Sequence, residues 1–542
     1  MAWDQQRSRA RITRLMTTVP SSTIDVRRFD QSYYQQRIND LQTRGRRLGL
    51  DDGPIANIPN NKAILVDGVH VYVQLIDYHD LIQIQGRETE ASHRRLLQAL
   101  HLHYSATDRV VEQFEIQRVD YHGPRLHAVV ITPIGNERER VLRAIAFATT
   151  VKKTIEEAGR LVGGSRLSTR VRIGIDTGMA VAVNSGRRAE PEPLFLGSPA
   201  NHAAKLAEGD EPGIFVSDRV RAVLSERPLG TLMEARASLT EDSQFRYANM
   251  SRNLPFSDNS DRLTRMSVDA AVRSLQADVD LNAITGNEAV FRFHHHEPPL
   301  RSIRFDELMP SNSIRMPVVS TFADISGFTA YVDRCIAMGR VSEMAANLHV
   351  IRGELAECAR DDFGARKVRF IGDCIHALNA DGSRVATDEP TSVDSAVRLA
   401  GGLRSSFDLC KSMLSGVAEL GLAIALELGP TPVTRLGIRG ERSVRCASSK
   451  AVSASEAMQS ELGGRQTALG PTALASAPRS IKDLFRNGPV YDLDYDAVTR
   501  LLSQSTYPAA PAKPAVLSSG LLISQGAAAR DAVREQGSGR HA

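Results

Sequence analysis

The sequence has few of the residues that would mark a disulfide-bonded or zinc-ribbon protein. Its 542 residues contain five cysteines, an odd number, and no Cys-x-x-Cys pair. A disulfide framework and a zinc ribbon are therefore excluded, and we expect a reducing, cytoplasmic location. No apolar run approaches the roughly 18 to 20 residues that span a bilayer, and the basic N-terminus lacks the apolar stretch of a signal peptide. We expect no membrane span.

The chain also has little excess of charge of either sign. The net charge is +4, and charged residues make up 24% of the chain against 42% apolar residues. This balance is typical of a folded globular chain and lacks the strongly basic footprint of a nucleic-acid binder. The sequence therefore predicts a folded protein without a nucleic-acid partner.

Three stretches differ in composition from the rest of the chain. Residues 1–58 are basic and end in turn formers, so we expect an N-terminal appendage. Residues 241–312 are polar and turn-rich around one helical patch, which predicts a connector. Residues 501–542 have the Pro, Ala, Gly and Ser bias of a disordered tail.

The two remaining blocks, residues 59–240 and 313–500, resemble two copies of one unit. Each opens with an alternating apolar strand followed by a helix, HVYVQLIDYHDL in the first and VVSTFADISGFT in the second. Each continues to a hairpin-like run and later to a strand that ends in glycine. Matching positions keep an offset of 247 to 252 residues. An internal duplication predicts such a steady register.

The second block carries two aspartates at points where strands end. Asp324 ends a predicted strand, and the turn after it leads into a helix whose N-terminal N–H groups suit an anion. Asp373 lies 49 residues later on a tight hairpin turn. Either aspartate alone is typical of a cap or turn residue. The two aspartates together, beside a turn that can bind an anion, indicate a site for two divalent cations. Such ions can bind the attacking and leaving oxygens of a displacement at phosphorus.

FADISGFT followed by IGDCIHAL resembles the class III nucleotidyl cyclases, which convert a nucleoside triphosphate to a 3′,5′-cyclic monophosphate. The resemblance implies an α+β fold in which two cyclase-like domains, each an antiparallel-rich sheet flanked by helices, pack as an intramolecular pseudo-dimer. It implies two divalent ions, Mn²⁺ or Mg²⁺, and no requirement for a homo-oligomer. The implied metal-binding residues are Asp324, Ile325 and Asp373. The implied substrate-binding residues are Gly327, Phe328 and Thr329, with Asp120 of the first block.

The first block departs from the family pattern at the metal positions. Asp77 matches the first metal aspartate, but Pro124 stands at the second and offers no ligand. Its segment LFLGSPANHAAKL resembles the family helix that presents an Asn and, four residues later, a basic residue, here Asn201 and Lys205. One helical turn places both on the same face. The resemblance implies that Asn201 orients the ribose and that Lys205, in place of the usual Arg, stabilises transition-state charge.

In the second block Ser453 and Ala457 occupy those two helix positions, so the basic residue is missing. Loss of one aligned transition-state donor costs ~100- to 1,000-fold in rate. The sequence therefore predicts one working site, assembled from the aspartates of the second block and the Asn–Lys helix of the first. The mirror site is predicted to be degenerate.

The base-contact positions that the family implies fall on Asp120 and Leu194 in the predicted working site, and on Arg369 and Cys446 in the mirror site. Neither pair matches the family's adenine or guanine determinants. Asp120 can accept a hydrogen bond from uracil N3–H or from an amino group. UTP therefore ranks first, with CTP or a purine nucleotide in ordinary signalling as alternatives.

A tandem cyclase without purine determinants resembles the pyrimidine cyclases of bacterial Pycsar antiphage systems, as does the segment RLGIRGERSVRCASSKAVSASE. This resemblance implies a uridylate cyclase whose product, cUMP, activates a separate cyclic-nucleotide-responsive effector. The alternative class is a catalytically silent cyclase-fold module that binds nucleotide. The complementary halves favour the enzyme, because random loss of residues would seldom leave them.

Two other motifs carry no predicted function. The run His294–His296 resembles a metal cluster, but three consecutive side chains do not converge easily on one ion, so we interpret it as a solvated linker. Gly163-Gly164 lacks the strand, loop, helix and lysine of a phosphate-binding P-loop.

Overall fold

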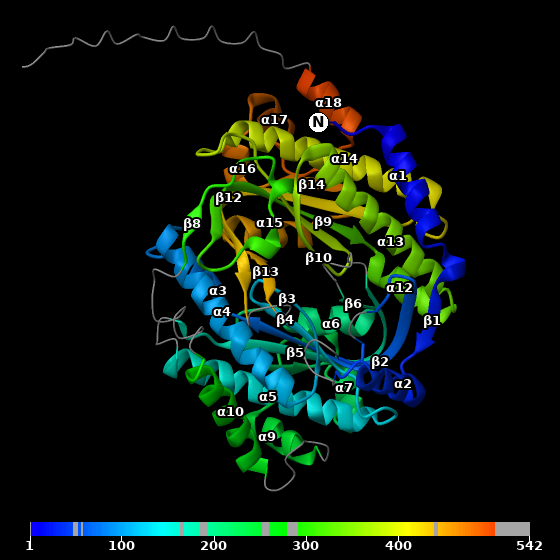
Figure 1. The fold of residues 1–542 in the computed structure, drawn as a ribbon, viewed down its shortest axis with the longest axis vertical. Coiled ribbons are helices and arrows are strands. Elements are labelled where there is room, and N and C mark those ends of the chain that lie inside the picture. The colour runs from blue at the N-terminus through cyan, green and yellow to red at the C-terminus, as the bar shows by residue number, and fades with distance from the viewer. Residues whose placement is uncertain are drawn as a thin grey trace, which may run out of the picture.

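The computed structural model describes residues 2–46, 53–55, 58–162, 167–184, 193–251, 260–278, 291–437 and 443–503. These residues form two sheets, each covered by helices, one built mainly from each block of the chain (Figure 1). The α+β fold expected from the sequence is confirmed. Most of the expected tail and Gly163-Gly164 lie outside the described residues.

The sheet of the first domain has the strand order β3-β4-β2-β5-β6, with β1 parallel to β2 and β7 parallel to β5. The pairs within the main order are antiparallel. The strands are β1 (Asp25–Arg28), β2 (Lys62–Leu75), β3 (Gln117–His122), β4 (Arg125–Val130), β5 (Val171–Asn184), β6 (Pro193–Leu196) and β7 (Gly213–Val216).

Alternation along β2 gives the first sheet its two faces. Val71 and Val73 point into a large apolar core with the helices α4 and α5, whereas Tyr72 and Gln74 point to the opposite face. The helices of this domain are α3 (Tyr78–Ile82), α4 (Glu90–Gln113), α5 (Glu137–Leu161), α6 (Ser198–Leu206), α7 (Asp218–Val223) and α8 (Thr231–Glu234).

The sheet of the second domain has the order β10-β11-β9-β12-β14-β15, with β13 beside β12 and β8 beside β9. The four strands β10-β11-β9-β12 therefore follow the same order as β3-β4-β2-β5 of the first sheet. The strands are β8 (Phe293–His294), β9 (Ser313–Ser326), β10 (Arg366–Ile371), β11 (Cys374–Asn379), β12 (Gly421–Leu436), β13 (Val444–Ala447), β14 (Gln466–Leu469) and β15 (Val490–Tyr491).

The helices α13 and α14 cover one face of the second sheet, and α15 packs against β12 and β9 (Figure 1). The helices of this domain are α12 (Phe328–Ala337), α13 (Val341–Glu357), α14 (Glu389–Met413), α15 (Lys450–Ser460), α16 (Pro471–Ser476), α17 (Arg479–Leu484) and α18 (Tyr495–Ser503). A π-helical turn, Cys358–Asp362, follows α13, and short 3-10 turns lie at Ser21–Thr23, Leu300–Ser302 and Phe305–Glu307.

The strand register identifies the first-domain counterpart of Asp324. The hairpin β3–β4 of the first domain pairs with β2, and the hairpin β10–β11 of the second domain pairs with β9. Both hairpins have a bulge at the same place, and both pair with the central strand in the same register. That register puts Gln74 at the position of Asp324. Asp77 lies three residues further on, at the start of α3. The expected match between Asp77 and Asp324 is therefore wrong, because residue type suggested it and strand pairing excludes it.

The N-terminal segment is packed against both domains and is not a free appendage. The helix α1 (Gln5–Thr18) lies along α13 of the second domain, with Ile12 fully buried (Figure 1). The buried Arg11 guanidinium donates to Glu354 at 2.7 and 2.9 Å and to Asp362 at 2.8 and 3.0 Å. The strand β1 then joins the first sheet, so this segment bridges the two halves.

The predicted connector is partly helical. Its helices α9 (Glu241–Met250) and α10 (Ser260–Gln276) pack against α5 of the first domain. In the histidine run, His295 contacts Thr387 and His296 contacts Ser302. The described residues contain no group of three or more His, Cys, Asp or Glu side chains arranged for a metal ion, and none of their helices is long and apolar enough to cross a membrane.

Candidate functional site

Two half-buried carboxylates face each other at one edge of the second sheet. Asp324 lies near the end of β9, and Asp373 lies in the turn between β10 and β11. The backbone N–H of Ile325 donates to both carboxylates. Burial raises the pKa of Asp324 to about 6. Burial and the neighbouring negative charge of Asp324 raise the pKa of Asp373 well above its ordinary range.

This pair fits divalent cations. Two carboxylates that hinder each other's ionisation gain most from a positive charge placed between them. The charge of Arg352 acts on Asp373 in that sense but does not restore its ordinary pKa. Carboxylate and carbonyl oxygens are the donors that Mg²⁺ and Mn²⁺ prefer, and such ions commonly complete their shell with water and substrate phosphates. Asp324, Asp373 and the carbonyl of Ile325 form such a donor set.

The turn after Asp324 presents a helix N-terminus. Gly327 has φ +84° and precedes the first residue of α12. Phe328 is buried, with 3% of its surface exposed, and anchors the helix, while Thr329 beside it is half-buried. The first N–H groups of a helix have no partner within the helix and favour an anion. The predicted phosphate turn is thus built as a strand, a glycine and a helix.

The helix α6 of the first domain presents Asn201 and Lys205 to solvent. Four residues separate them, so both lie on one face. The helix approaches β5 closely because Gly174 has no side chain there: a Cβ atom would lie 2.1 Å from the carbonyl oxygen of Ala203. At its start, Ser198 contacts Asp333 of α12, so this helix adjoins the helix that follows Asp324 (Figure 1).

The back of α6 is held by a buried charge cluster. His202 lies 3.2 Å from Asp176 on β5 and 3.1 Å from Glu234 on α8. Burial opposes ionisation of Asp176, but hydrogen bonds from His202, Arg219 and Ser217 outweigh it and lower its pKa. The hydrogen bond to Asp176 raises the pKa of His202. The cluster thus holds α6 through His202, which lies three residues before Lys205 and beside it on the helix surface.

Asp120, the predicted base contact, is paired across the domain interface. Its Oδ2 atom accepts from Arg369 Nη1 at 2.9 Å, and its Oδ1 atom accepts from the N–H of Tyr121 at 2.8 Å. Arg369 also donates to the carbonyl of Arg445. Leu194 is buried, with 6% exposed, in an apolar core and offers no polar group. The two hairpins therefore place a carboxylate and a guanidinium side by side.

The equivalent positions of the mirror site are filled by protein contacts. Gln74 accepts from Arg125 Nε at 2.8 Å. Arg125 and His122 both contact Glu456 of α15, at 3.1 and 3.2 Å. Burial opposes ionisation of Glu456, but His122 and Arg125 outweigh it and lower its pKa to about 2. This side of the interface is closed by charge pairing and has no carboxylate pair among the residues that the structure describes.

The carboxylate of Asp77 is likewise paired within the first domain. It forms an ion pair with Arg170 at 2.6 Å, and hydrogen bonds from Arg170 lower the pKa of Asp77. The neighbouring Tyr78 is buried and hydrogen-bonds to Ser448 and Ser453 of the second domain. The predicted mirror helix residue Ser453 thus contacts tyrosine in a packed interface, and Ala457 is exposed.

Sequence reasoning missed several residues around the site. Asp333, His202 and Asp176 support α6 but carry no family motif. Arg369 was assigned to the mirror site, although its side chain reaches Asp120. Only its position four residues before Asp373 could have suggested a role, because no local pattern reveals a contact between two hairpins 249 residues apart.

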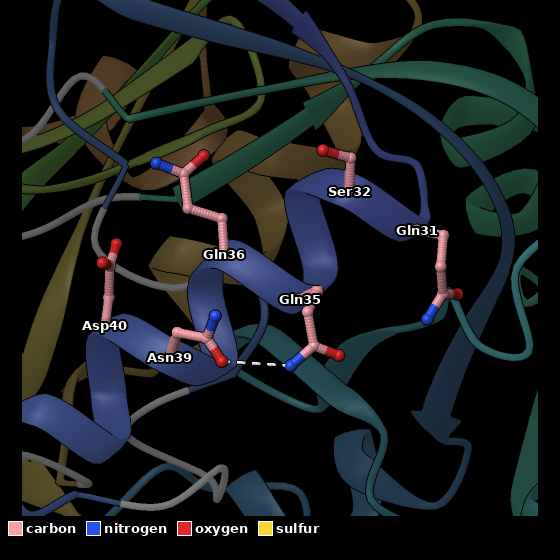
Figure 2. Close-up of a pocket in the computed structure, with 6 residues that line it drawn as sticks. All are labelled: Gln31, Ser32, Gln35, Gln36, Asn39 and Asp40. Atoms are coloured by element: carbon pink, nitrogen blue, oxygen red, sulfur yellow. Dashed lines mark hydrogen bonds between the residues drawn. The ribbon is translucent and has the colours of Figure 1, made fainter.

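A separate depression lies along α2 (Gln31–Thr43), as Figure 2 shows. All the side chains that line it come from this one helix, and Gln35 donates to Asn39 at 3.0 Å. Its residues are polar and include a single carboxylate, so it lacks a pair of acids such as Asp324 and Asp373. The lining residues are Gln31, Ser32, Gln35, Gln36, Asn39 and Asp40.

Comparison with known proteins identifies a family and relatives that match most of the chain. Residues 75–243 match the adenylate and guanylate cyclase catalytic domain. The chain is 51% identical over 503 residues to a protein of a Rhizobium species named uridylate cyclase, covering 92% of this chain and 95% of that one. It is 38% identical over 482 residues to a Pseudomonas aeruginosa protein of the same name, covering 87% and 90%.

A solved structure also spans both domains. The crystal structure of a class III adenylyl cyclase-like ATP-binding protein from Pseudomonas aeruginosa superposes with a TM-score of 0.80. The two sequences are 34% identical, and the alignment covers 93% of this chain and all of that one. Both halves of the chain therefore have counterparts in one related protein.

Proposed function

The chain belongs to the class III nucleotidyl cyclase family, and we propose that it converts UTP to 3′,5′-cyclic UMP and diphosphate at one site between its two domains. In this proposal the two domains act as the halves of a pseudo-dimer, as the family resemblance implies. The relatives named uridylate cyclase, at 51% and 38% identity over most of the chain, support UTP as the substrate.

One observation carries the single-site proposal. The only domain with a facing carboxylate pair at the strand and hairpin positions is the second, through Asp324 and Asp373, within the described residues. The matching positions of the first domain hold Gln74 and Pro124. Conversely, only the first domain presents an Asn and a basic residue one helical turn apart at the matching helix. Neither domain alone supplies both sets.

The reaction needs a bond from the ribose 3′ oxygen to the α-phosphorus and cleavage of the bond to the β-phosphate oxygen. The proton of the 3′-hydroxyl passes to water, and diphosphate leaves with the oxygen that bridged the α- and β-phosphorus atoms. Asp324, Asp373 and the Ile325 carbonyl would hold the divalent ions. Such ions, Mn²⁺ or Mg²⁺, lower the pKa of the hydroxyl and offset charge on the leaving phosphates when bound.

The chain's own residues orient the substrate and balance its charge. The N-terminal N–H groups of α12, at Phe328 and Thr329, bind triphosphate oxygens. Asn201 hydrogen-bonds the ribose and fixes the attacking oxygen in line with the phosphorus. Lys205 places a positive charge beside the negative charge that builds up on the α-phosphate oxygens. Because Lys is a point charge and lacks the fork of Arg, it tolerates small shifts of those oxygens.

Asp120 and Arg369 supply complementary groups for the base. The carboxylate of Asp120 can accept from uracil N3–H, while the Arg369 guanidinium can donate to a flanking carbonyl. Cytosine and guanine also offer a donor beside an acceptor, so these two residues do not discriminate by themselves. The identity of the relatives' substrate therefore decides the ranking of UTP over CTP and GTP.

We place the activity in bacterial antiphage defence, in line with the resemblance of the tandem arrangement to Pycsar cyclases. The product is a small diffusible nucleotide, so its action requires a separate protein that binds cyclic nucleotide. The second candidate function is nucleotide binding without turnover. It is favoured by the related solved structure, which is described as an ATP-binding protein, and by Lys205 in place of arginine.

One assay separates these functions. Purified chain is incubated with Mn²⁺ and each of UTP, CTP, GTP and ATP, and the products are resolved by chromatography and mass spectrometry. We expect cyclic UMP and diphosphate from UTP at the highest rate. Conversion of ATP alone would contradict the pyrimidine proposal, and binding of nucleotide without any product would favour the silent module.

A further inference from the structure

The first turn of α6 is capped by a residue of the other domain. The backbone N–H of Ser198 donates to Asp333 Oδ1 at 3.0 Å, and the Ser198 hydroxyl donates to Asp333 Oδ2 at 2.5 Å. The first N–H groups of a helix need acceptors outside it, and a side chain at the N-cap commonly serves the second or third of them. The N-cap of α6 is Gly197, which has no side chain, so the carboxylate arrives from α12.

The backbone at Gly197 is shaped to admit that carboxylate. Gly197 has φ +127°, which L-residues with a side chain rarely adopt. A Cβ atom there would lie 3.4 Å from Asp333 Oδ1 and 3.4 Å from the carbonyl oxygen of Met179. Glycine is therefore favoured here by its backbone conformation, and a Cβ atom would come to ordinary contact distance of Asp333.

Asp333 joins the two elements that the proposed reaction requires together. It lies on α12, whose first residues form the phosphate turn. Its acceptor atoms fix the start of α6, which carries Asn201 and Lys205. The charge of Asp333 also acts on Arg219, which is paired with Asp176 behind α6. A movement of α12 relative to the first domain would therefore move the start of α6.

A matching contact exists on the other side of the interface. The helix α15 has its first N–H group, that of Lys450, bonded to Glu88 Oε1 of the first domain at 2.9 Å. Glu88 also contacts His93 at 2.7 Å. The same helix carries Ser453 and Ala457, the degenerate positions. In both cases the first N–H of a helix donates to a carboxylate of the other domain, but α15 also has its own N-cap, because the Val452 N–H donates to Ser449. Only the contact of Asp333 serves the helix with Asn201 and Lys205.

We propose that Asp333 is a positioning residue for cyclisation: it locks α6 to α12 so that Asn201 and Lys205 reach the substrate held by the second domain. This inference rests on the proposed function. Asp333 touches no reacting atom in this account. It acts through α6, so its loss lowers the rate of the chemical step more than the affinity for nucleotide.

The test compares Asp333 variants with matched changes at Glu88. The proteins are full-length wild type, Asp333→Ala, Asp333→Asn, Glu88→Ala and Glu88→Gln. Three quantities are measured: kcat with UTP and Mn²⁺, the Kd for 3′-deoxy-UTP, which lacks the attacking hydroxyl, and amide hydrogen exchange in the peptide covering α6. The Glu88 pair removes an equivalent interdomain cap at the degenerate side and controls for general loosening of the interface.

For Asp333→Ala we expect kcat to fall about 10- to 100-fold, because misplaced groups lose most of their orientation advantage. The Kd for 3′-deoxy-UTP should change by less than about threefold, and exchange in α6 should become faster. Asp333→Asn keeps an oxygen that accepts from the Ser198 N–H, so it should recover part of the rate. The Glu88 variants should keep kcat near that of wild type.

Two results would overturn the positioning role: a kcat for Asp333→Ala equal to that of Glu88→Ala, or unchanged exchange in α6. An equal fall in affinity and rate would assign Asp333 to nucleotide binding and would also contradict the proposal. Wild type that forms no cyclic product from any nucleotide would instead contradict the proposed function, and the positioning role with it. Failure of the positioning role alone leaves wild-type turnover intact.

Discussion

Arg369 donates to Asp120 at 2.9 Å, from the hairpin of one domain to the hairpin of the other. Asp120 and Arg369 occupy matching positions in the two hairpins, one residue after the bulge in each, so the two equivalent positions meet each other. Burial opposes the charge of Arg369, but Asp120 outweighs it and raises the pKa of the guanidinium. The two hairpins are therefore joined by a carboxylate and a guanidinium, the pair that we propose for base recognition.

Replacement of this carboxylate should change base preference. We expect Asp120→Asn to lower kcat/KM for UTP about 10- to 100-fold, because a hydrogen bond to a charged group contributes about 1.5–3 kcal/mol. The ratio of UTP to CTP turnover should fall, since an amide can donate to cytosine N3. Competition assays with mixed nucleotides measure the ratio. An unchanged ratio would remove Asp120 from base recognition.

The acidic pair predicts a pH-dependent metal affinity. Burial raises the pKa of Asp324 to about 6, and a proton must leave before a divalent ion binds. The Kd for Mn²⁺ should therefore fall as pH rises from about 5 to 7. Calorimetry at several pH values checks this, with Asp77→Ala as a control that should keep the same profile. A flat profile in wild type would contradict the assignment of Asp324.

The contacts of Glu456 with His122 and Arg125 in the mirror site predict that the stability of the fold decreases in acid. The folded pKa of Glu456 is about 2, below its ordinary value of 4.5. A lowered carboxyl pKa contributes stability that is present above 4.5 and is lost as pH falls toward 2. Glu456→Gln should therefore flatten the fall in Tm across that window. The same slope in wild type and Glu456→Gln would show that His122 and Arg125 do not stabilise the ionised form.

We expect Arg11 of the N-terminal helix to make a large contribution to the free energy of unfolding. Arg11→Ala removes the guanidinium that Glu354 and Asp362 share, which leaves buried Glu354 without a cation, while Asp362 keeps Arg7 at 2.8 Å. Breaking such a buried pair costs about 3–5 kcal/mol. Urea unfolding measures the loss. Arg9→Ala, at an exposed position of the same helix, is the matched control and should change stability little. Equal stability of both variants would mean that the Arg11 contacts contribute nothing.

Local patterns in the sequence predicted the parts of the site that depend on neighbouring residues. The hairpin turn at Gly372-Asp373 and the helix after Gly327 both occur where the pattern of apolar residues, glycine and aspartate indicates them. The helix with Asn201 and Lys205 occurs where the resemblance of LFLGSPANHAAKL to the family helix implied it. The type of each of these elements is indicated by residues close to it in the chain, whereas its packing depends on distant residues such as Asp333.

Two other features could not be predicted because they depend on pairing between distant segments. Asp77 looked like the counterpart of Asp324 by residue type, yet the hydrogen-bond register assigns that position to Gln74. The contact between Asp333 and Ser198 joins residues 135 positions apart through the packing of two helices. Neither leaves a periodic or compositional trace in a single sequence.

The central claim is that the second domain supplies the metal aspartates and the first domain supplies the helix with Asn201 and Lys205. The most direct test measures the cyclisation rates of four single variants, each checked for folding: Asp373→Asn, Lys205→Ala, Gln74→Ala and Asp77→Ala. We predict that Asp373→Asn and Lys205→Ala each lower the rate about 100-fold or more, whereas Gln74→Ala and Asp77→Ala keep a rate near that of wild type. Loss of activity in Asp77→Ala with full activity in Asp373→Asn would contradict the account.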